Sequence, residues 1–180
     1  MTFMEIAARR ESCRNFEDKP VEQEKLMKIA ETARLAPSAC NSQPWKMVIV
    51  NEREQAAKTA KCLQDKILPI NQFTNRCPAF IVICEESANV LSKAGGKVKD
   101  QKYAEVDIGL LAAHICFTAV ELGLGTCIIG WLNEGKLQEL LQIPKNRRIR
   151  LVIAVGYPKS GEPRKKSRKP LEEILSFGQY

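Results

Sequence analysis

Four short groups of residues have the types and spacing to do chemistry, and two of them are basic. In the first, three arginines and a serine fall within the six residues from Arg9 to Arg14. Arginine offers forked, permanently charged donors, so this group can bind a phosphate. The second is the basic run from Arg164 to Lys169. From spacing alone, a solvated turn fits the first group equally well, and a solvated tail is the commoner structure for the second.

The third group is the connection Ala36–Trp45, which contains two prolines and several polar side chains. Ser38, Asn41 and Gln43 place hydroxyl and amide donors and acceptors in one short loop. A connection between a helix and a strand needs only a handful of residues. These side chains suit a flat, polar ligand, although Asn and Ser also commonly bond their own backbone in a well-capped loop.

The fourth group is Gly123–Trp131, which contains a Gly-x-Gly pair but no third glycine in the dinucleotide-binding frame. It also follows a helix, whereas that fingerprint needs a strand before it and a helix after it. We therefore expect Gly123 and Gly125 to end the helix. Gly130 falls inside an expected strand, where a glycine often marks the close approach of a ligand or a backbone.

Other common chemistries find little support in the composition. His114 is the only histidine and falls in an apolar helix, which favours a structural role and argues against zinc, Ser-His-Asp and Cys-His sites. We expect no metal site. Seven cysteines without a Cys-x-x-Cys motif are interpreted as buried free thiols in a reducing cytosol.

The hydrophobic pattern predicts the elements that must position these groups. Helices are expected at 2–9, 22–35, 52–66 and 107–122, with a short one around 137–141. Strands are expected at 47–50, 80–84, 126–131 and 149–156. Helix 107–122 is apolar on both faces, which predicts burial at the centre of the domain or of a dimer. Segment 87–102 contains Gly95-Gly96 and many lysines and is predicted to be a mobile surface segment.

Helices and strands mix without strict βαβ alternation, which favours an α+β fold with a mixed or antiparallel central sheet flanked by helices. The length predicts one domain over residues 1–180. There is no apolar run of 18 residues and no signal-peptide pattern at the start, so we expect a cytoplasmic protein without membrane association. The net charge of +7 suits a phosphate ligand, an anionic surface or nucleic acid, but no nucleic-acid-binding module is present.

Taken in order, the four groups resemble the nitroreductase family of FMN-dependent oxidoreductases, over nearly the whole chain. The resemblance rests on segments 10–16, 36–45, 107–130 and 156–174. It implies a homodimer with a long central helix and two FMN molecules at the dimer interface. It assigns the FMN phosphate and ribityl side to Arg10, Ser12 and Arg14, with Lys166 and Arg168 closing on the same phosphate.

The same resemblance gives roles to the remaining candidate site residues. Those that would line the isoalloxazine ring or the ribityl chain, from the same or the partner subunit, are Pro37, Ser38, Ala39, Asn41 and Gln43. Ile129 and Gly130 would pass their backbone along one face of the flavin.

The implied activity is a ping-pong reaction, in which NAD(P)H reduces tightly bound FMN and a nitroaromatic, a quinone or a similar small molecule then takes the electrons. A flavin supplies this chemistry itself, so no catalytic side chain is expected. Segments 63–77 and 87–102 are expected to shape the acceptor pocket. The alternatives are a flavin-binding or flavin-sensing protein without efficient turnover, a related flavin reductase or reductive dehalogenase, and a basic nucleic-acid-binding protein.

Overall fold

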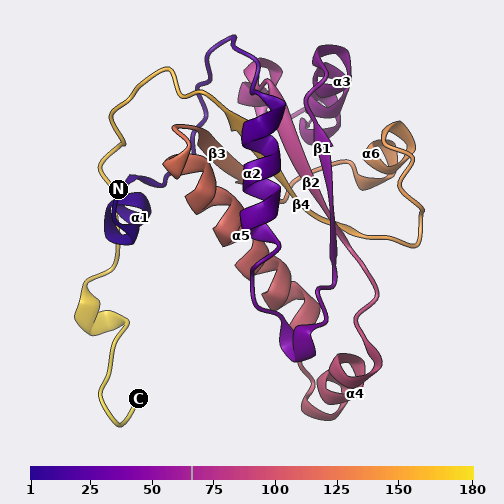
Figure 1. The fold of residues 1–180 in the computed structure, drawn as a ribbon, viewed down its shortest axis with the longest axis vertical. Coiled ribbons are helices and arrows are strands. Elements are labelled where there is room, and N and C mark those ends of the chain that lie inside the picture. Colours follow the sequence, from indigo (N-terminus) through magenta and orange to yellow (C-terminus); the bar gives the residue numbers. More distant parts are fainter. Residues whose placement is uncertain (66) are drawn as a thin grey trace.

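The fold is built on one antiparallel sheet, and the computed structural model describes residues 1–65 and 67–180 (Figure 1). The strands are β1 (Trp45–Val50), β2 (Ala79–Glu85), β3 (Gly125–Ile129) and β4 (Ile149–Gly156), in the spatial order β1-β2-β4-β3. All four expected strands are present, and the predicted α+β class is confirmed with an antiparallel sheet. β3 ends at Ile129, however, so the expected strand end at Trp131 is wrong and Gly130 follows the strand.

The described residues form six helices, of which α2, α5, α3 and α6 cover the two faces of the sheet. They are α1 (Phe3–Arg9), α2 (Gln23–Ala33), α3 (Arg53–Leu63), α4 (Val90–Lys99), α5 (Tyr103–Glu121) and α6 (Glu134–Leu140). Short 3-10 turns are η1 (Ala39–Asn41), η2 (Gln72–Arg76) and η3 (Leu171–Glu173). The expected start of α1 is confirmed, because Thr2 Oγ1 accepts from Glu5 N and the Glu5 carboxylate accepts from Thr2 N. The third helix ends at Leu63 and Gln64 is extended, so the expected helix over Gln64 and Asp65 is wrong, while Lys66 lies outside the described residues.

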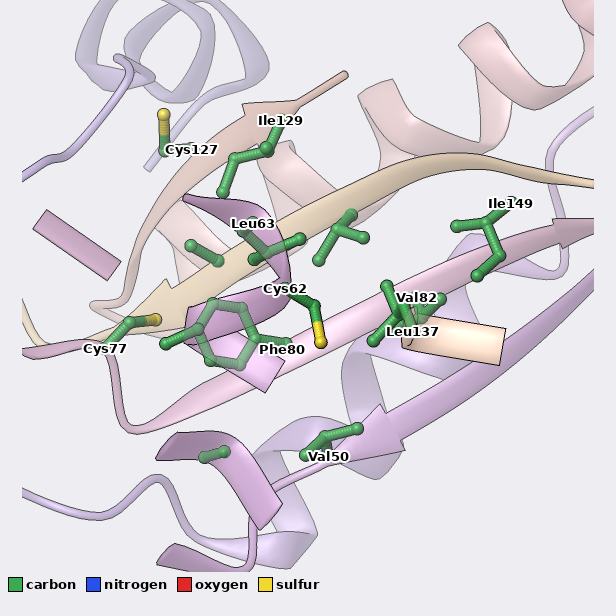
Figure 2. Close-up of a cluster of buried hydrophobic side chains, with 14 of the residues drawn as sticks. Val50, Cys62, Leu63, Cys77, Phe80, Val82, Cys127, Ile129, Leu137 and Ile149 are labelled. Atoms are coloured by element: carbon green, nitrogen blue, oxygen red, sulfur yellow. The ribbon is translucent and has the colours of Figure 1, made fainter. Parts of the chain in front are cut away.

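Alternation along β2 creates two hydrophobic cores, one on each face of the sheet. Phe80 and Val82 point to the core that α3 and α6 cover, where Ile129 and Leu137 also lie (Figure 2). Ile81 and Ile83 belong to the other core, which α2 and α5 cover. A strand buried on both faces reads as a continuous apolar run in the sequence, which explains why β2 could be recognised.

Six of the seven cysteines are buried and only Cys40 is exposed. The prediction of buried free thiols is therefore confirmed for six of them. Burial raises the pKa of the Cys77 thiol to about 12 and that of Cys84 to about 11, so both stay protonated at neutral pH. These thiols act as small apolar core residues.

Helix α5 has one buried and one open face. Leu111 and Ile115 are fully buried against the sheet, whereas Val106 is 58% exposed and Leu110 is 38% exposed. Among residues 1–65 and 67–180, α5 is the one helix that is long and apolar enough to cross a membrane. Buried core helices often have the same length and composition, so this is weak evidence for a membrane span. His114 lies half-buried, outside the two cores, with Nδ1 2.8 Å from the Leu110 carbonyl oxygen.

Segment 87–102, which the sequence predicts to be a mobile surface segment, contains helix α4 (Val90–Lys99). The Asn89 side chain caps this helix by accepting from Ser92 N at 2.8 Å, which typically stabilises a helix by about 1 kcal/mol. Gly96 is required by packing, since a Cβ there would lie 2.7 Å from the Gln101 carbonyl oxygen. The chain turns back at Asp100, which has a left-handed φ of 49°. Gly95-Gly96 therefore permits a tight helix end and does not prevent the helix.

Candidate functional site

The N-terminal segment is held along the edge of the sheet next to β3. Cys13 N donates to the Thr126 carbonyl oxygen at 2.8 Å, and Ser12 forms a parallel bridge with Thr126. A Cβ on Gly125 would lie 2.8 Å from Cys13 Cβ, so this close contact requires glycine. Gly123 has φ 76° and ends α5 as predicted, but the expected helix-ending role of Gly125 is wrong.

The C-terminal tail folds back onto this N-terminal segment. Arg164 Nε lies 3.1 Å from a carboxylate oxygen of Glu11, and Arg164 Nη2 donates to the Ser12 carbonyl oxygen at 2.7 Å. The Lys166 ammonium donates to the carbonyl oxygens of Ala7 and Ala8 at the end of α1. These contacts bring the basic tail alongside the first arginine group.

The two basic groups line one cavity of about 300 Å³, which we call the basic cavity. Its lining residues are Arg10, Glu11, Ser12, Arg14, Arg164, Lys165, Lys166, Ser167 and Arg168. Six of these side chains are cationic and only Glu11 is anionic. Burial and the neighbouring guanidiniums of Arg10 and Arg168 lower the pKa of the Lys166 ammonium. The charges are thus not neutralised within the cavity, which favours an anion.

The donor set of the basic cavity fits a phosphate monoester. Such a group carries nearly two negative charges and three acceptor oxygens. Forked guanidiniums, an ammonium and the hydroxyls of Ser12 and Ser167 supply charge-assisted and neutral hydrogen bonds to these oxygens. The structure therefore brings together five of the predicted site residues, namely Arg10, Ser12, Arg14, Lys166 and Arg168.

The loop from Ser38 to Gln43, which we call the polar loop, is fixed near the N-terminal end of α5. Asp107 is only 3% exposed, and its two carboxylate oxygens lie 3.1 and 3.2 Å from Ala39 N, which donates to them. Ser38 Oγ accepts from Gln43 N at 2.9 Å, and Gln43 Nε2 donates to Asn41 Oδ1 at 3.1 Å. The amide side chains of Asn41 and Gln43 are exposed, and Pro37 beside them is exposed as well.

The backbone of the polar loop is strained. Cys40, Asn41 and Gln43 have φ values of 52°, 50° and 47°, in the left-handed region. This conformation costs a residue with a side chain about 1–2 kcal/mol, although Asn tolerates it better than most. Such strain persists only where the surroundings hold it, and it clusters at ligand and active sites. The polar loop is therefore a second candidate for a functional surface.

The last two predicted site residues lie at the end of β3. The Ile129 side chain is buried in the core under α3 and α6, so only its backbone is available to a ligand (Figure 2). Gly130 is exposed, and a Cβ built on it would meet nothing within 4 Å. Open space next to this backbone is compatible with a flat ligand.

Helix α1, which Lys166 of the basic cavity contacts, and turn η1 of the polar loop lie near opposite ends of α5 (Figure 1). The Phe3 ring, on α1 beside the basic cavity, packs edge-on against Phe117 with 5.2 Å between the ring centres. Asp107, which holds the polar loop, comes ten residues earlier in the same helix. Ten residues of α-helix span about 15 Å.

Three residues organise the two surfaces in ways that the sequence did not predict. Glu11 and Arg164 dock the tail, and Asp107 anchors the polar loop. Only the position of Asp107, near the start of an apolar helix, distinguishes it in the sequence. Within residues 1–65 and 67–180, no group of three His, Cys, Asp or Glu side chains is placed to hold a metal ion.

Comparison with known proteins gives a consistent family assignment. The sequence model of the Nitroreductase family matches residues 7–157. A provisionally named NADH dehydrogenase/NAD(P)H nitroreductase of Archaeoglobus fulgidus is 32% identical over 154 residues, which cover 83% of this chain and 82% of the relative. Human iodotyrosine deiodinase 1 is 26% identical over 196 residues, which cover 96% of this chain and 67% of the relative.

The fold is also similar to that of solved structures. An FMN-dependent nitroreductase from Clostridium difficile R20291 superposes with a TM-score of 0.76 at 25% identity, covering 98% of this chain and 99% of that chain. The predicted fold type is thereby confirmed. The family match spans well over half of the sequence and includes both the first arginine group and the polar loop. The chain therefore belongs to the nitroreductase family.

Proposed function

We propose that this chain is an FMN-dependent oxidoreductase that uses NAD(P)H to reduce a small acceptor such as a nitroaromatic or a quinone. The observation that carries the proposal is the basic cavity. It joins Arg10, Ser12 and Arg14 to Lys166 and Arg168, more than 150 residues away in the sequence. The names of similar proteins support the same ligands, since one is an NAD(P)H nitroreductase and another is FMN-dependent.

We further propose that the working form is a homodimer in which FMN lies between the two chains. The phosphate would bind in the basic cavity of one chain. The isoalloxazine ring would lie against the polar loop of its partner. The open face of α5, with Val106 and Leu110 exposed, supports an interface between copies because apolar helix surfaces of this kind are usually covered.

In this proposal the residues of the chain bind and orient the cofactor. The basic cavity neutralises the phosphate, and the exposed amides of Asn41 and Gln43 offer hydrogen bonds to polar ring edges. The backbone of Ile129 and Gly130 leaves room for a flat face. FMN, when bound, supplies the hydride chemistry. The buried free thiols support a reducing, cytoplasmic compartment.

A second candidate is reductive dehalogenation. It is supported by the similarity to iodotyrosine deiodinase, which extends over 96% of this chain. The two candidates share the flavin site and differ in the acceptor. Turnover of a halogenated phenol compared with that of a nitroaromatic and a quinone would separate them.

The test of the proposed function is an absorption spectrum of the purified protein, followed by anaerobic titration with NADH and with NADPH. We expect a yellow protein, or a colourless one that becomes yellow with added FMN, whose flavin band bleaches with at least one nicotinamide. Protein that takes up no FMN would contradict the proposal. Tight FMN binding with very slow reduction by both nicotinamides would instead favour a flavin-binding protein without efficient turnover.

A further inference from the structure

Asn89 connects helix α4 to the polar loop through groups that its capping role does not use. Its Oδ1 accepts from Ser92 N and caps the helix. Its Nδ2 donates to the Cys40 carbonyl oxygen at 3.0 Å, and its backbone N donates to Ser42 Oγ at 2.8 Å. Its carbonyl oxygen accepts from Lys93 N, so Asn89 makes four hydrogen bonds, two of which join the start of α4 to the loop.

Asn89 contacts the strained part of the loop at two residues. Cys40 has a left-handed φ, and Ser42 lies between Asn41 and Gln43, which also have left-handed φ values. On its other side, the loop is held by Asp107 through Ala39 N. The loop is therefore held between α5 and α4, and Asn89 supplies the contacts on the α4 side.

We propose that Asn89 is a positioning residue for the polar loop. By tying the loop to helix α4, it fixes the position of the loop relative to that helix. This rests on the proposed function, in which the polar loop faces FMN, and on the expectation that segment 87–102 shapes the acceptor pocket. It goes beyond that function by assigning a role to a residue that touches neither ligand. The cap of α4 and the geometry of the flavin wall are then set by the same side chain.

The cap and the tether can be separated by substitution. Asn89→Ser keeps a good N-cap, since a serine oxygen also accepts from the first turn of a helix. It removes the donor to the Cys40 carbonyl oxygen. Ser42→Ala removes the acceptor of the second tether without touching α4. Asn133→Ser is the matched control, because Asn133 caps α6 by accepting from Lys136 N at 3.1 Å.

The first measurement is amide hydrogen exchange in FMN-free protein. We expect Asn89→Ser to speed exchange at Asn41, Ser42 and Gln43 by about twofold to tenfold, the range for one lost hydrogen bond. The double variant Asn89→Ser, Ser42→Ala should show a larger effect. Exchange at Ser92 and Lys93 in α4 should stay as in the wild type. The control Asn133→Ser should leave the loop unchanged.

The second measurement is the FMN dissociation constant of the same variants. We expect an increase of about twofold to tenfold for Asn89→Ser and none for Asn133→Ser. Unchanged loop exchange in Asn89→Ser and in the double variant would overturn the proposal and leave Asn89 as a helix cap only. If the wild type binds no FMN, the proposed function fails, whereas the exchange measurement still decides whether the tether exists.

Discussion

The basic cavity and the polar loop are built in opposite ways. The cavity depends on long, charged side chains from the two ends of the chain, which meet because the tail folds back onto the N-terminal segment. The loop depends on a strained local backbone that Asp107 and Asn89 hold in place. The first surface offers positive charge and the second a fixed backbone shape, which is what the proposed FMN would need at its two ends.

The basic cavity and the polar loop lie near opposite ends of α5. The surfaces that we propose for the phosphate and for the ring of one FMN lie at different ends of one helix, whose exposed face carries apolar side chains. A second copy that covers this face could bring its polar loop to the first copy's basic cavity. In this account each flavin site is shared between two chains.

The largest effect is expected from removing charge in the basic cavity. The double variant Arg10→Gln, Arg168→Gln loses two charge-assisted contacts, each worth about 1.5–3 kcal/mol. The FMN dissociation constant, measured by fluorescence titration, should rise at least about hundredfold. Lys169→Gln removes a tail charge outside the cavity lining and serves as the control. Equal effects of the double variant and of the control would mean that the tail and the cavity attract FMN only through their overall positive charge.

The open face of α5 should control the oligomeric state. Leu110→Glu places a charge where we expect a buried contact in both copies. The variant should be monomeric by light scattering, and FMN affinity should fall by about tenfold or more, since burying a leucine contributes about 1.5–3 kcal/mol. Ile67→Glu, at a side chain that is 92% exposed, should leave the oligomeric state unchanged. A monomeric variant with full FMN affinity would show that the site lies within one chain.

The polar loop should contribute less than the basic cavity. Asn41→Gly with Gln43→Ala removes both exposed amides, and glycine keeps the left-handed φ at position 41. We expect about a tenfold weaker FMN complex with an unchanged melting temperature, because the two amide groups bond mainly to each other. If the melting temperature falls instead, the loop acts in stability and not in binding.

The smallest effect we expect is a pH dependence of FMN affinity, which arises from the basic cavity and not from the polar loop. The pKa of Lys166 is lowered in the free protein by burial and by Arg10 and Arg168. A bound phosphate adds negative charge and raises that pKa, so binding favours the protonated lysine. FMN affinity should therefore fall as the pH rises from neutral through the free-state pKa of Lys166. Lys166→Met should flatten this profile, whereas the polar-loop variant should keep it.

Much of this architecture could be predicted from the sequence, because buried strands and apolar helices leave strong patterns. β2 was recognisable as an apolar run, and Thr2 with Glu5 marked the start of α1. Helix α4 was not recognisable, since Gly95-Gly96 is typical of a flexible segment. Its cap at Asn89 and the tight return at Asp100 depend on contacts that local propensity does not contain.

The candidate site shows the same limit. Residue types and order pointed to the arginine group, the polar loop and the basic tail. The pairing of the two chain ends depends on Glu11 and Arg164, and the anchoring of the loop depends on Asp107. These are contacts between residues far apart in the sequence, so no local pattern could reveal them.

The most direct test of the shared site is a hybrid dimer. One chain carries Arg10→Gln and Arg168→Gln, and its partner carries Asn41→Gly and Gln43→Ala. If each site joins the cavity of one chain to the loop of the other, one site combines both defects and the second is fully wild type. The account predicts one FMN per hybrid dimer, bound with wild-type affinity. A hybrid in which neither site reaches wild-type affinity would contradict it. Each site would then lie within one chain, and each chain carries substitutions in its own site.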